Sequence, residues 1–292
     1  MPLFDSQFLK KLEYLSLISR RAFRGSLLAQ RRTMQLGGGI EFADHREYTP
    51  GDDFRYLDWN VYARHDALLL KRFQEEEDLH VYLFLDCSRS MDFGAPNKFD
   101  FARQVTAALA YIALADLDRV AVIAFSNEIV ADFPLARGKA RILSLLKFLE
   151  GLTPQGEVTD LARVTSGFVH RTQRRGLAVV VSDLYDPGGF ERGLDVLRHR
   201  RYEPHVVQIH DRREADPDVL GDIELFDIES QRTRKVTVTE RNLRQYRAIF
   251  DRFQQSVQRY CRTHGLGCTR ASTEVAFDEL ILRMMRQAGA VG

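Results

Sequence analysis

The sequence predicts an α/β fold built on a doubly wound, mostly parallel β-sheet. From residue 79 onward, short apolar runs alternate with segments of helical periodicity, which is the pattern of repeated strand–helix units. The apolar runs show no polar alternation, as is typical of parallel strands that are buried on both faces. Two of the runs, at 81–85 and 177–182, are each followed directly by an aspartate. Polar residues at strand ends are the usual ligand-binding positions of such sheets.

Each element of this fold has its own signal. Apolar residues that recur every three or four positions predict a helix, and a short apolar run bounded by turn residues predicts a strand. In chain order these signals predict strand 81–85, helix 98–116, strand 120–125, edge strand 129–133, helix 139–150, helix 160–174, strand 177–182, helix 189–200, strand 205–210, a β-hairpin insertion at 223–239, helix 240–263, strand 267–272 and helix 277–287.

The segment before the main domain is less regular. A helix is predicted over 6–24, where apolar residues recur at helical spacing. Residues 37–78 are predicted to form a small, partly β extension. We therefore predict two parts: 1–78, with the first helix and the extension, and 79–292, which forms the α/β domain.

Two features of the extension carry polar residues. The sequence PGDD at 50–53, which includes Asp52 and Asp53, is interpreted as a turn and not as a second acidic site, because Pro, Gly and Asp all favour turns. A buried polar network around the single tryptophan is predicted for three residues, Asp58, Trp59 and Arg64.

The overall composition excludes several classes of protein. The chain has 292 residues, with 42 Lys and Arg against 41 Asp and Glu, so it has no general attraction to nucleic acid or to anionic membranes. Charges interrupt every apolar run before the roughly 20 residues that a membrane helix needs. The first residues lack the apolar core and the cleavage site of a signal peptide. The three cysteines show no CxxC spacing, which favours reduced thiols in a cytoplasmic protein over disulfides or a zinc site.

Five oxygen-bearing residues are predicted to converge at the carboxyl edge of the sheet. They are Asp86, Ser88 and Ser90 after the first strand of the domain, Thr159 before a helix, and Asp183 after a later strand. Alternate residues of an extended loop point the same way, so the first three can present their oxygens together. Hard oxygen ligands suit Mg²⁺, Mn²⁺ or Ca²⁺. We expect the serines and the threonine to bind the ion directly and the aspartates to reach it through water.

The order Asp86-x-Ser88-x-Ser90, Thr159, Asp183 resembles the metal-ion-dependent adhesion site of von Willebrand factor A-type domains. The resemblance implies that an acidic residue of a protein partner fills the last coordination position of the ion. It also implies a binding role without catalysis.

A longer stretch resembles the prokaryotic family called domain of unknown function 58. The resemblance rests on GGGIEFADHREYTPGDDFRYLDWNVYAR, on LKRF and on LDCSRSM. Members of that family are often encoded beside a MoxR-type AAA+ ATPase, which implies that the partner is such an ATPase or its substrate. One departure is Glu157-Val158 before Thr159, where a second glycine is common, and this places Thr159 in most doubt among the five residues.

Simpler interpretations of the same residues stay open. Asp86 and Asp183 can cap the helices that follow them, and Ser88 and Ser90 can be turn residues. Cys87 is expected to be a small buried apolar residue whose side chain points away from the serines.

Other functions are also possible in principle. A metal-dependent hydrolase would use the same cation to activate water, and Glu157 is the only candidate base beside the five residues. The chain has no GxSxG elbow and no GxxxxGK[ST] loop. A nucleic-acid binder would use the arginine clusters at 171–175 and 198–201, although solvated helix ends account for both clusters.

Overall fold

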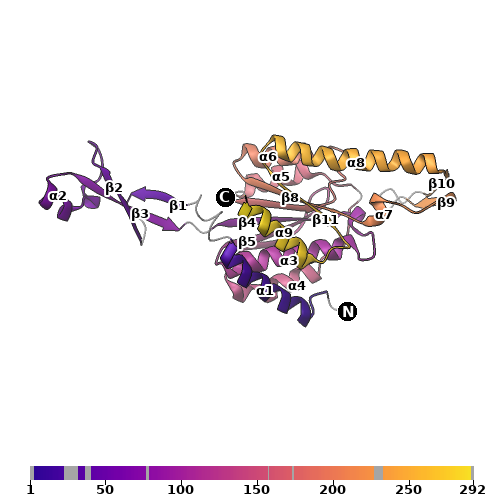
Figure 1. Cartoon of the computed structure of the whole chain (residues 1–292), viewed down its shortest axis with the longest axis horizontal. Coiled ribbons are helices and arrows are strands. Elements are labelled where there is room, and N and C mark those ends of the chain that lie inside the picture. The colour runs from indigo at the N-terminus through magenta and orange to yellow at the C-terminus, as the bar shows by residue number, and fades with distance from the viewer. Residues whose placement is uncertain are drawn as a thin grey trace. The chain divides into compact units, whose positions relative to one another are not determined.

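The computed structural model describes residues 3–22, 32–36, 41–76, 79–156, 158–172, 174–226 and 233–290 of the chain. The chain divides into two compact units. Unit 1 comprises Met1–Ser19 and Leu79–Met285, and unit 2 comprises Arg20–Asp78 and Arg286–Gly292. Unit 1 contains the predicted α/β domain, and unit 2 contains the small β extension (Figure 1).

The first helix, α1 (Ser6–Ala22), belongs for most of its length to unit 1, whereas the sequence analysis grouped it with the extension. Its buried apolar side chains are Phe8, Leu12 and Leu15. The ring of Phe8 lies 4.7 Å from that of Phe277 in α9 (Phe277–Ala290), measured between ring centroids. This apolar contact between the first and last helices explains why α1 lies with the α/β domain.

Unit 1 is built on a six-stranded sheet with the strand order β11-β8-β7-β4-β5-β6. Neighbouring strands pair in parallel, except that β6 pairs antiparallel with β5 at one edge. The strands are β4 (His80–Asp86), β5 (Arg119–Phe125), β6 (Ile129–Arg137), β7 (Leu177–Ser182), β8 (Glu203–His210) and β11 (Gly267–Ser272). The doubly wound, mostly parallel sheet and its antiparallel edge strand are therefore confirmed.

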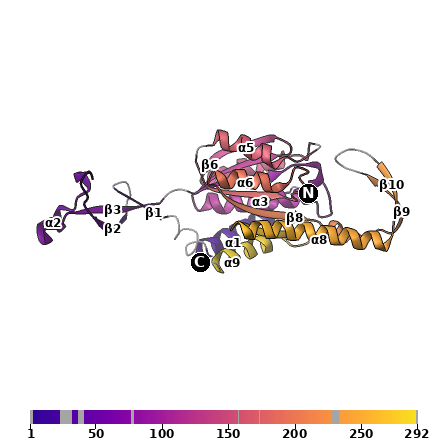
Figure 2. The same ribbon diagram turned by 90° about the horizontal axis from the view of Figure 1, so that it is seen from above.

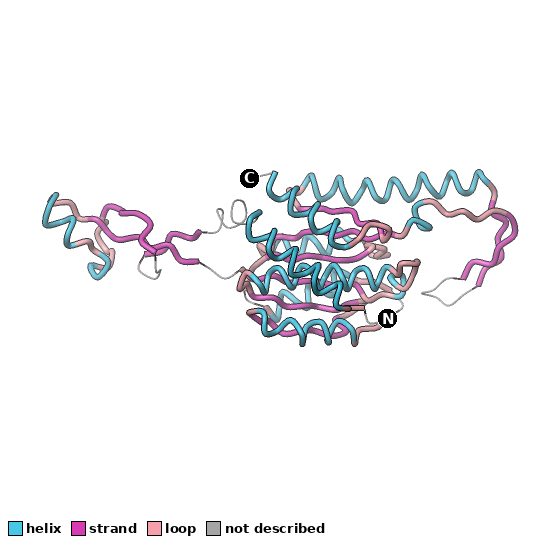
Figure 3. Tube along the Cα trace, turned by 60° about the horizontal axis from the view of Figure 1, so that its bottom comes forward, coloured by secondary structure: helices cyan, strands magenta, loops and turns pink. Residues whose placement is uncertain are grey.

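Helices cover both faces of this sheet (Figure 3). They include α3 (Lys98–Ala115), α4 (Ile142–Glu150), α5 (Leu161–Arg171), α6 (Phe190–His199), α7 (Arg212–Ala215) and α8 (Glu240–Thr263). Helices α5 and α6 lie on one face and α3 and α4 on the other (Figure 1). The sequence predicted all of these except α7, which is too short to show a helical period. Within the described residues, no helix combines the length and the apolar character needed to cross a membrane.

Strand β4 lies in the middle of the core. On one side, Tyr82 and Phe84 each place their ring centroid 4.9 Å from that of Phe168 in α5. On the other side, Leu83 and Leu85 are completely buried. An apolar strand that is packed on both faces is held rigidly, so β4 fixes the position of the loop that follows it.

The site-bearing loops lie at the switch point of the sheet. Strand β4 has β5 on one side and β7 on the other, both parallel to it. The chain passes from β4 through α3 to β5, and it returns through α5 to β7 on the opposite side of β4. Ligands of open α/β sheets bind at the carboxyl ends of strands where the strand order reverses in this way.

The predicted hairpin insertion is present as β9 (Gly221–Phe226) and β10 (Thr233–Val238). Figure 2 shows it at the N-terminal end of α8, beyond the strands of the sheet. The C-terminal half of α8 buries Val257 and Cys261 in the core.

Unit 2 contains a three-stranded antiparallel sheet with the order β1-β3-β2. Its elements are β1 (Arg32–Leu36), β2 (Glu41–Glu47), the 3₁₀ turn η1 (Phe54–Tyr56), α2 (Trp59–His65) and β3 (Leu69–Glu76). Residues 50–53 form the predicted turn, and Asp52 stabilises it by accepting a 2.9 Å hydrogen bond from the backbone N–H of Thr49. The glycines at 37–39 lie outside the described residues.

The network predicted around the tryptophan is centred on Asp58 instead. Asp58 is buried, caps the N-terminus of α2, and accepts a 3.0 Å contact from His45 Nε2. Trp59 is 60% exposed and Arg64 is also exposed, so the prediction of a buried network around Trp59 was wrong. Trp59 is the first residue of a short helix, and its side chain projects outward while the preceding Asp58 turns inward to cap the helix.

Candidate functional site

Asp86 is the last residue of β4 and is completely buried. Its Oδ1 atom accepts a 2.8 Å hydrogen bond from the backbone N–H of Ser88, and its Oδ2 atom accepts a 2.5 Å hydrogen bond from Ser182 Oγ at the end of β7. Burial raises the pKa of Asp86 well above its usual range, and the nearby Asp183 carboxylate raises it further, while the hydrogen bonds from Ser182 and Ser88 oppose this shift. An acid in this environment is stabilised in its ionised form by an added cation.

Ser88 and Ser90 turn their hydroxyls toward each other. Their Oγ atoms are 2.9 Å apart, and Ser88 is completely buried. Ser88 precedes the 3₁₀ turn η2 (Arg89–Met91), but its side chain makes no capping hydrogen bond there. A role as turn residues alone therefore does not explain why the two hydroxyls face each other.

Cys87, between Asp86 and Ser88, is buried as predicted. Its side chain is completely buried and its Sγ atom contacts the backbone carbonyl of Leu85 at 3.6 Å. Burial raises the pKa of its thiol. The sulfur is thus an inert apolar group and not an additional ligand.

Thr159 lies in the loop between α4 and α5 and is 2% exposed. Its Oγ1 atom is buried and has no hydrogen-bond partner among the described residues. The loop is fixed to the neighbouring loops by hydrogen bonds from Gln155 N to Cys87 O at 2.7 Å and from Asp160 N to Ser126 O at 3.2 Å. The structure therefore holds the Thr159 loop against the loop that carries the two serines.

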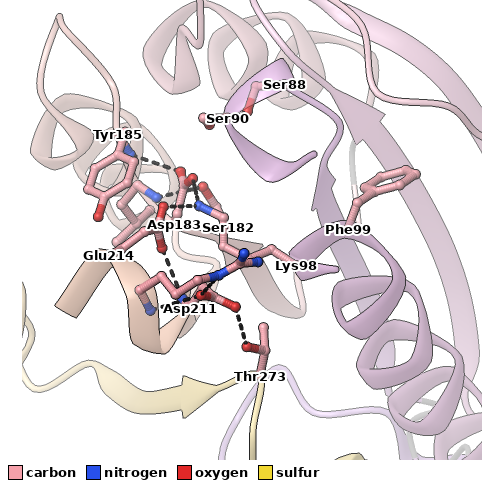
Figure 4. Close-up of polar contacts among 12 residues, drawn as sticks. Ser88, Ser90, Lys98, Phe99, Ser182, Asp183, Tyr185, Asp211, Glu214 and Thr273 are labelled. Atoms are coloured by element: carbon pink, nitrogen blue, oxygen red, sulfur yellow. Dashed lines mark hydrogen bonds and ion pairs between the residues drawn. The ribbon is translucent and has the colours of Figure 1, made fainter. Parts of the chain in front are cut away.

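Asp183 follows β7, the strand that pairs with β4. It is 1% exposed. Its Oδ1 atom accepts a 3.1 Å hydrogen bond from Tyr185 N, and its Oδ2 atom is 2.8 Å from Lys98 Nζ (Figure 4). Lys98 is the first residue of α3, and its Nζ atom also lies 2.5 Å from Glu214 Oε1 in α7.

The two aspartates do not cap the helices that follow them. Asn97 caps α3, and the residue before α6 is Gly189, which offers no side chain. Asp86 and Asp183 each accept a hydrogen bond from the backbone N–H two residues onward. They stabilise their own loops by these bonds, and each keeps its second oxygen for contacts across the sheet edge.

The sequence analysis did not identify Lys98, Ser182 or Glu214 as parts of this edge. Lys98 carried one usable signal. A lysine at the first position of a helix faces the positive end of the helix dipole, so its charge there requires compensation from carboxylates elsewhere. Nothing in the sequence pattern indicates that one of those carboxylates is Glu214, which is 116 residues away along the chain.

The residues of the edge suit a hard cation. Among the residues that the structure describes, no group of three or more His, Cys, Asp and Glu side chains could hold a metal ion, so a cation here would use hydroxyl oxygens. Ser88, Ser90 and the unpartnered Thr159 supply such oxygens, and Asp86 and Asp183 supply negative charge nearby. Oxygen donors of this kind fit Mg²⁺, Mn²⁺ or Ca²⁺. The candidate base Glu157 lies outside the described residues.

Comparisons with known proteins give relatives that are themselves uncharacterised. An uncharacterised protein from Mycobacterium tuberculosis is 27% identical over 238 residues, which is 80% of this chain and 75% of that protein. An uncharacterised protein from Mycobacterium avium is 32% identical over 85 residues, which is 29% of this chain and 50% of that protein.

Similar solved structures include two proteins from Bacteroides. The conserved hypothetical protein BatB from Bacteroides thetaiotaomicron aligns with a TM-score of 0.47 and 16% identity, covering 73% of this chain and 99% of that one. An aerotolerance-related membrane protein from Bacteroides fragilis aligns with a TM-score of 0.45 and 15% identity, covering 72% and 99%.

One protein family matches most of the chain. The family described as "Protein of unknown function DUF58" matches residues 44–258. The match begins in β2, ends in α8 and includes all five residues of the predicted ligand set. This chain therefore belongs to the DUF58 family of proteins of unknown function.

Proposed function

We propose that this chain is a von Willebrand factor A-type protein that holds a divalent cation at the carboxyl edge of its sheet and binds a protein partner through it. The observation that carries the proposal is the buried hydroxyl of Thr159, which has no hydrogen-bond partner among the described residues. Burying a hydroxyl without a partner costs about 1–3 kcal/mol. A cation bound between Thr159 and the serine pair would satisfy this oxygen.

The proposed ion is Mg²⁺, with Mn²⁺ or Ca²⁺ as close substitutes. Ser88, Ser90 and Thr159 would contact it directly, and Asp86 and Asp183 would reach it through water. Because the direct protein ligands are neutral, the ion keeps much of its positive charge. It therefore attracts a carboxylate from outside, most strongly where water is excluded.

The proposed partner presents an Asp or Glu to the ion. Membership in the DUF58 family and the sequence resemblance described above support a MoxR-type AAA+ ATPase, or its substrate, as that partner. The protein would act in the cytoplasm as a non-enzymatic adaptor in the assembly or remodelling of other proteins. The spacing of Cys87, Cys261 and Cys268, which form no CxxC pair, supports a reducing compartment.

Manganese binding to the purified protein tests the ion. We expect the wild-type protein to bind one Mn²⁺, measured by electron paramagnetic resonance of the free ion, and Asp86→Asn and Thr159→Val to lose this binding. Ser144→Ala removes an exposed hydroxyl on α4 and is the matched control, with unchanged binding. Equal binding by wild type and Thr159→Val would refute the proposed ligand set.

Capture of the ATPase tests the partner. A MoxR-type ATPase encoded beside the chain's gene should bind the immobilised protein in Mg²⁺ and be released by EDTA. Asp86→Asn should abolish capture. Capture that persists in EDTA would mean that the interaction uses a different surface.

A metal-dependent hydrolase remains the competing function. Among the described carboxylates, Glu214 in α7 has Oε1 bound to Lys98 and Oε2 bound to the backbone N–H of Asp211, so both of its oxygens already have partners. We expect no hydrolysis of ATP or of phosphoesters by the purified chain. Turnover that Glu157→Gln abolishes in a folded protein would favour the hydrolase.

A further inference from the structure

Lys98 brings a buried positive charge to the candidate cation site. Its side chain has no exposed surface, and its Nζ atom is 2.8 Å from Asp183 Oδ2 and 2.5 Å from Glu214 Oε1. Figure 4 shows the ammonium group between these carboxylates, with the Asp183 end of the pair beside Ser182. Ser182 in turn donates a hydrogen bond to Asp86. Lys98 thus contacts Asp183 directly, and Asp183 follows in the chain the serine that binds Asp86.

This lysine stays charged despite its surroundings. Its two carboxylate partners, Asp183 and Glu214, lie within ion-pair distance of the Nζ atom and favour the ammonium form. The aromatic rings of Tyr185 and Phe93 lie 5.3 Å and 5.9 Å from the ammonium nitrogen, which further favours a cation. Lys98 therefore acts as a fixed positive charge and not as a proton donor.

The charged groups near Lys98 carry more negative charge than positive charge. When they are ionised, Asp86, Asp183 and Glu214 carry three negative charges and Lys98 carries one positive charge. The neighbouring Asp211 has its own counter-ion, because Arg213 Nε lies 3.3 Å from its Oδ1 atom. A net negative charge therefore remains beside the proposed ion position, and it favours a cation there.

We propose that Lys98 and Glu214 set the affinity of the site for the cation by charge, with Lys98 weakening the binding and Glu214 strengthening it. The inference rests on the proposed cation site and adds two residues that do not themselves coordinate the ion. Lys98 competes with the ion for Asp183, so the ion is held loosely until the carboxylate of a partner joins it. Glu214 offsets the Lys98 charge and so strengthens the attraction of the site for the ion.

The test compares Mn²⁺ affinity in wild type, Lys98→Met, Glu214→Gln and the double variant. Lys98→Met leaves Asp183 and Glu214 without their ammonium partner and should bind Mn²⁺ about tenfold more tightly, or more. Glu214→Gln keeps the shape of the side chain, removes one negative charge and should bind about tenfold more weakly. The double variant restores the wild-type net charge and should return to within a few-fold of wild-type affinity.

A purely structural role gives a different pattern. If Lys98 only holds Asp183 and α7 in place, both single variants bind Mn²⁺ more weakly and the double variant is no better than either, which would overturn the inference and leave the cation site standing. If none of the four proteins binds Mn²⁺ at millimolar concentration, the inference and the proposed function both fail.

Folding of the variants is checked by circular dichroism. If Lys98→Met does not fold without an ion, the comparison is made by thermal unfolding of the other proteins. Glu214→Gln should then gain a smaller Mn²⁺-dependent increase in melting temperature than wild type, because a ligand that binds only the native state stabilises it more when it binds more tightly. An equal or larger increase would overturn the inference.

Discussion

The Oδ2 atom of Asp186, in the loop after β7, accepts a 2.8 Å hydrogen bond from the backbone N–H of Leu161, the first residue of α5. The same carboxylate accepts a 2.7 Å hydrogen bond from Gly188 N through its other oxygen. Asp186 therefore joins the loop that carries Asp183 to the helix that follows Thr159. This side chain therefore helps to hold Thr159 in position relative to Asp183.

Replacing Asp186 with Ala should loosen the site. We expect the free energy of unfolding to fall by about 1 kcal/mol for the lost hydrogen bonds, and Mn²⁺ affinity to fall because Thr159 is no longer held relative to Asp183. Thr239→Ala is the control, since it removes the cap of α8 at a similar cost and should leave Mn²⁺ affinity unchanged. Chemical denaturation and manganese titration of both variants distinguish the two effects. An Asp186→Ala protein that binds Mn²⁺ normally would show that the loops are positioned by other contacts.

Two glycines with similar backbones allow a second comparison. Gly156 and Gly138 have φ angles of +91° and +83°, so alanine is strained at either position. A Cβ atom at Gly156 would lie 2.6 Å from Ser126 Oγ, whereas one at Gly138 would meet nothing within 4 Å. We expect Gly156→Ala to lower the melting temperature more and to weaken Mn²⁺ binding, because its loop carries Thr159. Equal melting temperatures for the two variants would contradict this.

The partly buried His205 should make stability depend on pH. Burial lowers the pKa of His205 to about 4 from an ordinary value of 6.5, so between these values the unfolded chain binds a proton that the folded chain does not. The contribution of this residue to the free energy of unfolding is therefore fully present above pH 6.5 and declines as the pH falls toward 4. Urea denaturation at several pH values should show a smaller decline for His205→Gln than for wild type. Parallel curves for the two proteins would disprove the assignment.

The rate at which the Cys87 thiol is labelled should depend on whether the neighbouring site holds an ion. Cys87 and Cys261 are both completely buried, so each reacts with iodoacetamide only when its surroundings open. We expect Mn²⁺ to slow the labelling of Cys87, which neighbours Ser88, and to leave the labelling of Cys261 in α8 largely unchanged. Mass spectrometry of the labelled peptides measures both rates in one sample. If Mn²⁺ slows both equally, the ion stabilises the whole unit and not this loop in particular.

The fold was predictable from the sequence because its signals are local. The buried strands β4 and β7 are continuous apolar runs, and each ends where an aspartate interrupts the run. The identities of Asp86, Ser88 and Ser90 at one strand end, and of Asp183 at another, could be read in the same way. Their grouping at one edge follows from parallel strand order, and the structure confirms that β4 and β7 are neighbours.

The contacts that cross the sheet edge could not be predicted. The pairing of Lys98 with Asp183 joins residues 85 positions apart, and its partner Glu214 lies in a helix of four residues that leaves no periodic trace. Trp59 was misjudged for a related reason. It was predicted to lie in a buried polar network with Asp58 and Arg64, but Asp58 turns inward to cap α2 and Trp59 is exposed.

The position of α1 in unit 1 means that the small β extension interrupts the α/β domain in sequence. A segment inserted within the sequence of a domain can be deleted or replaced when the rest of the domain folds without it. Here the contact between the rings of Phe8 and Phe277 joins the first and last helices of the α/β domain. A protein in which a flexible linker replaces residues 20–78 should therefore fold and bind Mn²⁺ like the full chain. Any partner that this shortened protein no longer binds would be a partner of the extension.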